Sequence, residues 1–225
     1  MAKQDLWRHG EQYLGARLDV TTVDADPIAQ FRSWFADAEA TGLKNVNAMT
    51  LATADRDGRP SARMVLLKEL DERGFVFFTN YDSRKADELT VNPRAALLFY
   101  WLPLDRQVRI EGTVERISSA DSDAYFATRP LESRLGAIAS PQSQVIPSRE
   151  SLEARVDAAR AAAGSDAPAR PSYWGGYRVV PDLIELWQGQ PDRLHDRIRY
   201  RRADAETGTG AGTGAGGWTL ERLAP

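Results

Sequence analysis

A chain of 225 residues, of which 42% are hydrophobic and 27% charged, can bury a hydrophobic core as one large domain or two small ones. Its formal net charge of −3 argues against a general polyanion-binding protein, because such proteins carry a large positive excess. The absence of cysteine excludes disulfides, thiolate metal sites and a cysteine nucleophile. The N-terminus lacks a signal-peptide core and no apolar run reaches the ~20 residues of a membrane span, so we expect a soluble, cytoplasmic protein.

The first predicted element is a helix over residues 26–42. Asp26 is a good N-cap, Pro27 fits the first helical position, and Gly42 ends the pattern. Further helices are predicted at roughly 83–91, 119–128 and 148–163. Residues 1–25 are expected to form a flexible N-terminal segment, and residues 26–225 a single domain.

Strands are predicted in three groups that follow the chain. These comprise residues 48–55, 60–70 and 75–80, then 94–102 and 107–117, and finally 173–180, 183–189, 193–202 and 217–223. Many strands joined by short turns, with few helices, indicate a mainly β (α+β) fold in which helices flank a closed or partly closed barrel. The glycine-rich stretch 205–217 is predicted to be a flexible loop without function.

A row of cations occupies the last part of the chain, "RLHDRIRYRR", at residues 193–202. In a strand, side chains alternate between faces. One face would then carry Arg193, His195, Arg197 and Arg199. In a mildly acidic protein such a row predicts a local anion site.

Two other groups of polar residues suit phosphate binding. Arg84 and Lys85 fall in the first turn of a helix that Asp82 or Ser83 can cap, where they oppose the helix dipole unless an anion binds there. The alternative, that both side chains point into water, is slightly favoured on this fragment alone.

The other group is Tyr125, Arg129 and Ser133, spaced at i, i+4 and i+8, with Pro130 expected to bend or end the helix. A phenol, a guanidinium and a hydroxyl can hold a phosphomonoester, although an exposed Tyr–Arg pair and a serine cap explain the pattern equally well. Arg63 and Lys68 bracket four apolar residues of a predicted strand. They are either surface groups or ligand anchors at the mouth of a barrel.

Long ordered motifs from about residue 26 to the C-terminus resemble the pyridoxamine/pyridoxine 5′-phosphate oxidase family. They are "RMVLLK", "GFVFFTNYDSRKADEL", "LDRQVRIEGTVER", "SDAYFATRPLESRLGAIASPQS", "SYWGGYRVVP", "IELWQG", "RLHDR" and "RLAP". The resemblance implies an FMN-binding split β-barrel and a homodimer with two flavins at the subunit interface. It also implies oxidation of pyridoxamine or pyridoxine 5′-phosphate by dioxygen. The products would be pyridoxal 5′-phosphate, hydrogen peroxide and, from the amine, ammonia.

The resemblance also implies site residues. FMN would contact Arg63, Met64, Val65, Leu66, Leu67, Lys68, Phe78, Thr79, Arg84, Lys85, Gln107, Gln142, Ser143, Trp187 and Arg197. The substrate phosphate would meet Lys68, Tyr125, Arg129 and Ser133. Arg193 and His195 would be the catalytic pair that holds the pyridine ring, with His195 as a candidate proton acceptor. Tyr13 would belong to a substrate lid in which Gly10 replaces an expected arginine, for which Arg8 is a candidate substitute.

Two alternatives remain at this point. A strand-rich nucleic-acid binder could use the 193–202 row, but the acidic net charge counts against it. A split-barrel protein that binds a flavin or pyridoxal phosphate without oxidase activity would not need all the substrate residues together. We expect no metal site, because the chain has two histidines far apart and no cysteine.

Overall fold

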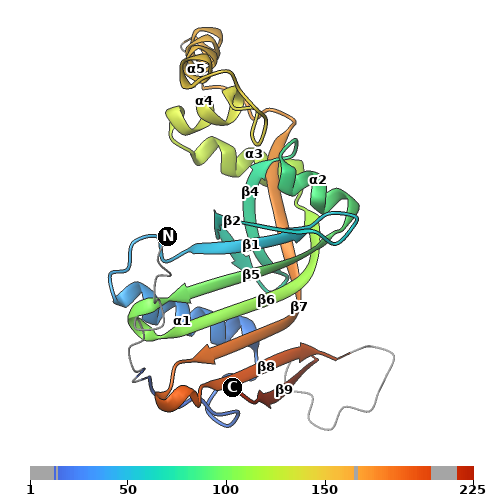
Figure 1. Ribbon diagram of the computed structural model, residues 1–225. Helices are drawn as coiled ribbons and strands as arrows, with labels where there is room; N and C mark the ends of the chain where they lie inside the picture. Colours follow the sequence, from blue (N-terminus) through green and yellow to red (C-terminus); the bar gives the residue numbers. More distant parts are fainter. Residues whose placement is uncertain (1–12, 14, 165–166, 204–216) are drawn as a thin grey trace, which may run out of the picture. The chain divides into compact units, whose positions relative to one another are not determined.

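The computed structural model describes residues 13, 15–164, 167–203 and 217–225 (Figure 1). The predicted positions Arg8 and Gly10, and nearly all of the predicted 205–217 loop, lie outside the described residues. The chain divides into two compact units. The first unit comprises Met1–Val46, Leu98–Ile110 and Asp182–Pro225, and the second comprises Asn47–Leu97 and Glu111–Pro181. The prediction that residues 26–225 form a single domain stays a prediction.

The strands of the described residues belong to one sheet with the order β2-β1-β5-β6-β7-β4-β3, and β8 pairs with both β7 and β9. The strands are β1 (Ala48–Ala54), β2 (Pro60–Leu66), β3 (Glu69–Asp71), β4 (Gly74–Asn80), β5 (Arg94–Trp101), β6 (Arg106–Arg116), β7 (Trp174–Gln188), β8 (Asp196–Arg202) and β9 (Trp218–Leu223). The helices are α1 (Pro27–Ala40), α2 (Arg84–Val91), α3 (Ser119–Thr128), α4 (Leu131–Ala139) and α5 (Arg149–Ala163). Among the described residues, no helix has both the length and the apolar character needed to cross a membrane.

In the second unit, β1 and β2 form an antiparallel hairpin from Ala48 opposite Leu66 to Ala54 opposite Pro60 (Figure 1). Gly58, with φ 78°, lies in the turn between them, and the Asp55 carboxylate accepts from two backbone N–H groups of this turn. Alternate β1 residues, among them Met49 and Leu51, are fully buried. This alternation orients the opposite face of the hairpin toward the surface.

Two predictions in this unit need correction. The expected strand 60–70 is interrupted at Leu67 and Lys68, so that β2 and β3 are separate strands with different partners. The helix α4 was not predicted. Pro130, expected to bend or end a helix, ends α3 and is the N-cap of α4, because proline cannot donate a backbone hydrogen bond within a helix.

The strand β7 is continuous over residues predicted as two strands, although Pro181 lies inside it. Two glycines pack closely against its backbone near this proline. A Cβ atom at Gly74 would overlap the carbonyl oxygen of Val179, and one at Gly112 would overlap that of Val180. Gly74 also has φ 141°, which other residues rarely adopt.

In the first unit, α1 begins and ends close to the predicted bounds. The Asp26 side chain accepts a hydrogen bond from the Ile28 backbone N–H at 2.9 Å, and the chain leaves the helix through Gly42 with φ 74°. Buried Phe31 on α1 packs edge-on against Phe99, with ring centroids 5.0 Å apart. The helix is therefore held by its apolar stripe.

The predicted strand over residues 193–202 begins only at Asp196. Asp192 and Arg193 adopt left-handed backbone angles, with φ 54° and 62°, which end the extended conformation needed for strand alternation. Arg193 and His195 therefore precede β8 and do not share a strand face with Arg197. Within β8 the alternation holds, because Ile198 and Tyr200 are fully buried.

Candidate functional site

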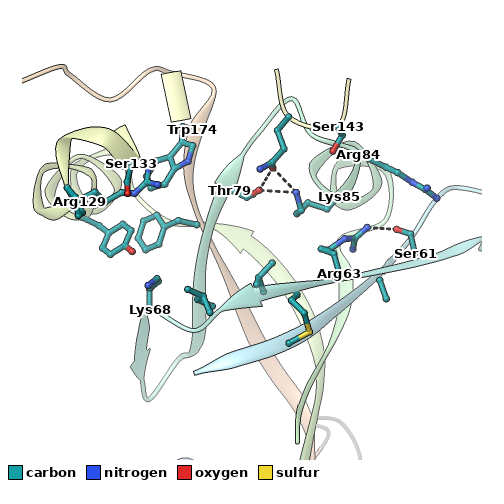
Figure 2. Close-up of a pocket in the computed structure, with 18 of the residues that line it drawn as sticks. Ser61, Arg63, Lys68, Thr79, Arg84, Lys85, Arg129, Ser133, Ser143 and Trp174 are labelled. Carbon is teal, nitrogen blue, oxygen red and sulfur yellow. Dashed lines mark hydrogen bonds between the residues drawn. The ribbon is translucent and has the colours of Figure 1, made fainter. Parts of the chain in front are cut away.

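A cavity of about 820 Å³ lies in the second unit (Figure 2). The predicted residues that line it are Arg63, Met64, Val65, Leu66, Lys68, Phe78, Thr79, Arg84, Lys85, Tyr125, Arg129, Ser133, Gln142 and Ser143. They come from β2, β4, the start of α2, the helices α3 and α4, and the segment after α4. Leu67 does not line the cavity; its side chain is buried and its backbone N–H donates to the Asn47 carbonyl at 2.9 Å.

One side of the cavity, here called the Lys85 end, comprises Arg63, Thr79, Arg84, Lys85 and Gln142. The buried Lys85 ammonium donates to the Thr79 hydroxyl at 3.1 Å and to the Gln142 side-chain oxygen at 2.8 Å (Figure 2). It also donates to the Ser83 hydroxyl at 3.1 Å. Ser83 is the N-cap of α2 by position, but its side chain makes no capping bond and donates instead to the Asn80 carbonyl. Of the two predicted caps, Asp82 or Ser83, it is Ser83 that occupies the N-cap position, without a side-chain bond to the helix.

A buried carboxylate, Glu88, organises the two arginines of this end. One of its oxygens lies 2.8 Å from Arg84 Nε, and the other lies 3.3 Å from Arg63 Nη2. The second oxygen also accepts from the hydroxyls of Thr53 and Ser61, at 2.5 Å each. Arg63 in turn donates to both of these hydroxyls. The guanidinium groups are therefore held in place before any ligand arrives.

Two pKa values in this network are lowered, for different reasons. Desolvation, followed by the nearby Arg63 charge, lowers the pKa of Lys85 to about 8, although Glu88 partly opposes this. Burial alone would raise the pKa of Glu88, but hydrogen bonds from Ser61, Thr53 and Arg84 and the charge of Arg63 outweigh it and lower that pKa to about 2. Glu88 is therefore an anion at neutral pH, while Lys85 loses its proton in mildly alkaline solution.

The other side, here called the Arg129 end, comprises Lys68, Tyr125, Arg129 and Ser133. Figure 2 shows Arg129 and Ser133 together on one side, away from Lys85, with Trp174 beside them. The Arg129 guanidinium lies over the Trp174 ring at 4.6 Å, and its buried Nη1 has no hydrogen-bond partner in the part of the chain that the structure describes. Desolvation lowers the pKa of Arg129, with Tyr125 opposing. A buried N–H group without a partner is costly, and an anion here would satisfy it.

Apolar surface separates the two ends. On β2 the side chain of Met64 is 62% exposed and that of Leu66 is 38% exposed, and both line the cavity. Phe78 stacks on Tyr125 with ring centroids 3.9 Å apart, and on Trp174 at 5.4 Å. A cavity with cationic ends and an apolar middle suits flat organic molecules that carry phosphate groups.

The remaining predicted residues belong to the first unit. Tyr13 contacts Trp187 edge-on, with centroids 5.5 Å apart, and His195 at 5.3 Å. Arg197 lies opposite Trp187 in the β7–β8 register and donates to the buried Glu185 carboxylate at 2.8 Å. Gln107 lies on β6, and Arg193 is exposed in the turn before β8. The structure therefore brings Tyr13, Trp187 and His195 together as one aromatic cluster.

His195 is half-buried in this cluster. Its Nδ1 accepts a hydrogen bond from the Gln190 backbone N–H at 3.1 Å, and its ring lies 4.6 Å from that of Trp187. Desolvation, followed by the charge of Arg193, lowers the pKa of His195 below its usual value of 6.5. The imidazole is therefore neutral at physiological pH.

Among the residues that shape the cavity or its lining, sequence reasoning missed Ser61, Glu88 and Trp174, as well as Ala62, Thr128 and Pro130. Ser61 lies two positions before Arg63 on the same strand face, and Glu88 follows Arg84 at i+4, so their spacing was a usable signal. The stacking of Trp174 on Phe78 depends on the pairing of β4 with β7, in which Phe78 lies opposite Gly176. No local pattern indicates that contact.

Comparison with known proteins gives matches along most of the chain. The family model described as "Pyridoxamine 5'-phosphate oxidase" matches residues 35–162, and "Pyridoxine 5'-phosphate oxidase C-terminal dimerisation region" matches residues 174–225. The "Pyridoxine/pyridoxamine 5'-phosphate oxidase" of Ralstonia pickettii is 57% identical over 214 residues, which is 95% of each chain. The protein of the same name from Salinibacter ruber is 56% identical over 96% of each chain.

Solved structures support the fold prediction. PhzG from Burkholderia lata, in complex with tetrahydrophenazine-1-carboxylic acid, has a TM-score of 0.83 and 31% identity, covering 94% of this chain and 99% of that one. A pyridoxamine 5′-phosphate oxidase-related, FMN-binding protein from Nostoc punctiforme has a TM-score of 0.66 and 21% identity, covering 87% of this chain and 97% of that one. The second likeness concerns the fold alone. The predicted mainly β split barrel with flanking helices is confirmed.

Proposed function

The chain belongs to the pyridoxine/pyridoxamine 5′-phosphate oxidase family, and from that membership we propose that it oxidises these two B6 phosphates to pyridoxal 5′-phosphate, using FMN and dioxygen. Hydrogen peroxide is the second product, and the amine substrate also gives ammonia. The observation that carries the proposal is a single cavity with two separate cationic ends and apolar surface between them. Such a cavity suits two phosphorylated aromatic molecules.

The Lys85 end suits the phosphate of FMN. Its cations are already oriented by Glu88 and Gln142, so that binding a phosphate requires little further ordering. The exposed Met64 and Leu66 offer apolar surface for a planar ring. When bound, the flavin would supply the redox chemistry by accepting a hydride equivalent from the substrate. The protein's part is to hold and orient both molecules.

The Arg129 end suits the phosphate of the substrate. The unpartnered Arg129 Nη1, together with Lys68, Tyr125 and Ser133 in the same lining, can donate hydrogen bonds to phosphate oxygens. Holding the phosphate also fixes the position of the pyridine ring to which it is attached. The binding energy of the phosphate contacts therefore contributes to the orientation of that ring.

We further propose that the working protein is a homodimer with FMN at the subunit interface. The match of residues 174–225 to a dimerisation region supports this, and that region includes Trp187, Arg193, His195 and Arg197. In the proposed dimer, Arg193 and His195 hold the substrate ring, while Gln107, Trp187 and Arg197 contact the flavin. Tyr13 covers the substrate through its contact with His195.

The visible spectrum of the purified protein tests this function. A bound flavin gives a yellow protein, and pyridoxamine 5′-phosphate added without air should bleach the flavin band, which air should restore. The Arg193→Leu variant is the matched control, since it should keep the flavin but bleach far more slowly. A colourless preparation that binds no FMN contradicts the proposal, and a yellow protein that does not bleach indicates a flavin-binding protein without this activity.

A further inference from the structure

The turn that carries Arg193 has an unusual backbone. Asp192 and Arg193 both have positive φ angles, 54° and 62°, although neither is glycine. A non-glycine residue in this region costs of order 1 kcal/mol or more and persists only where surrounding contacts fix it. One such contact is the hydrogen bond from the Leu194 backbone N–H to the Pro191 carbonyl at 3.1 Å. The side chain of His195 makes another, with the Gln190 backbone N–H.

The His195 contact fixes the chemical state of the ring. The Gln190 backbone N–H can only donate, so the Nδ1 atom that faces it at 3.1 Å must carry a lone pair. In the neutral imidazole the proton then resides on Nε2. An imidazolium would place an N–H group against an N–H group and would lose this hydrogen bond.

We propose that His195 is a neutral clasp: its Nδ1 closes the 190–195 turn that presents Arg193, and its Nε2–H donates a hydrogen bond to the bound substrate. On this assignment His195 does not accept the substrate's proton, which revises the role inferred from the sequence. Only the identity of the ligand rests on the proposed function; the clasp and the tautomer do not.

The surroundings of the ring agree with this assignment. Tyr13 and Trp187 pack against it without contributing charge, and the cation Arg193 disfavours a second positive charge. The neighbouring carboxylate of Asp196 is engaged elsewhere, since it accepts from the Leu18 backbone N–H at 3.0 Å and from Arg222 at 2.8 Å. Within the described part of the chain, none of these contacts stabilises an imidazolium.

Nitrogen NMR tests the tautomer directly. The chain has two histidines, His9 and His195, so a His9→Gln variant leaves only the signals of His195. At pH 7.5, without ligand, we expect a protonated Nε2 and a bare Nδ1. A proton on Nδ1, or a cationic ring at that pH, overturns the proposal. Because no substrate is present, the result does not depend on whether the protein is an oxidase.

Two isosteric variants test the clasp. The asparagine of His195→Asn can place its amide oxygen near the position of Nδ1, whereas the glutamine of His195→Gln reaches toward the position of Nε2. Amide hydrogen exchange at Gln190 should stay close to wild type in His195→Asn and become at least tenfold faster in His195→Gln. Equal exchange in the wild type and both variants overturns the clasp. If the clasp holds while substrate never bleaches a bound flavin, the proposed function alone is wrong.

Discussion

The two ends of the cavity carry similar charges but are prepared differently. At the Lys85 end the cations are already hydrogen-bonded, with Glu88 between the arginines and Gln142 on the ammonium. At the Arg129 end a buried guanidinium N–H has no hydrogen-bond partner among the described residues. Binding at the Lys85 end therefore requires little further ordering, whereas at the Arg129 end a bound anion supplies a hydrogen bond that this donor otherwise lacks.

The largest expected effect comes from Arg129→Met. Removing the unpartnered guanidinium should raise the KM for pyridoxamine 5′-phosphate about 100-fold, since a phosphate loses more than one charge-assisted hydrogen bond. The free energy of unfolding should fall by about 1 kcal/mol at most, because the buried Nη1 has no hydrogen-bond partner in the described part of the chain and the variant loses only cation–π contact such as that with Trp174. Steady-state kinetics and chemical denaturation measure the two quantities, and flavin retention is the control. A clear loss of stability would show that the two ends are not prepared differently.

Lys85→Met tests the other end. FMN should bind about 10- to 100-fold more weakly, as expected for losing one hydrogen bond to a charged group. Riboflavin, which lacks the phosphate, should bind equally to the variant and the wild type. Fluorescence titration of the two flavins measures both affinities. Equal weakening for the two flavins would place Lys85 beside the ring rather than the phosphate.

The lowered pKa of Lys85 predicts a pH dependence of FMN affinity. Lys85 is neutral above about pH 8 in the free protein, while a bound phosphate favours the ammonium and raises its pKa. Binding above pH 8 therefore takes up a proton, and the Kd should rise by up to about tenfold per pH unit. Titrations at pH 7, 8 and 9 measure the slope. In the Lys85→Met variant the Kd for FMN should not change between pH 7 and pH 9.

The smallest effect is on stability. Glu88→Gln should lower the free energy of unfolding by about 1–3 kcal/mol at pH 7, because hydrogen bonds to a charged group are lost. The folded pKa of Glu88, about 2, lies below its ordinary value of 4.5, so its contribution is complete above pH 4.5 and is lost as the pH falls toward 2. The stabilities of variant and wild type should therefore converge in acid. A constant difference down to pH 2 would contradict an ionised Glu88.

Much of the fold followed from local sequence signals. Three local features each depend on the chemistry of one residue. They are the helix cap at Asp26, the turn at Gly58 and the end of α3 before Pro130. The strand predicted to begin at residue 193 was wrong in its first residues. Leu194 lies in step with Ile198 and Tyr200 in the alternating sequence pattern, but it belongs to the turn before β8. In the structure Leu194 is 69% exposed, while Ile198 and Tyr200 are fully buried.

The cavity was less predictable than the strands around it. Tyr125 and Ser133 have the i, i+8 spacing of one helix face, but the chain breaks at Pro130 as expected, and the two residues come from α3 and α4; both line the cavity. That closeness depends on how the chain turns at Pro130, which spacing alone does not give. The tautomer of His195 could not be predicted either. It depends on a hydrogen bond from the Gln190 backbone N–H, and a backbone group leaves no signal in the sequence. The roles assigned to individual site residues stay predictions.

The tight backbone approach near Pro181 has a consequence for reading mutational data. Gly74 and Gly112 leave no room for even a methyl group beside the carbonyl oxygens of Val179 and Val180. A saturation survey of variants would therefore score both positions as intolerant, as strongly as any residue that touches a ligand. Their intolerance would reflect steric exclusion in the sheet, and a map of function drawn from such a survey should leave both positions off.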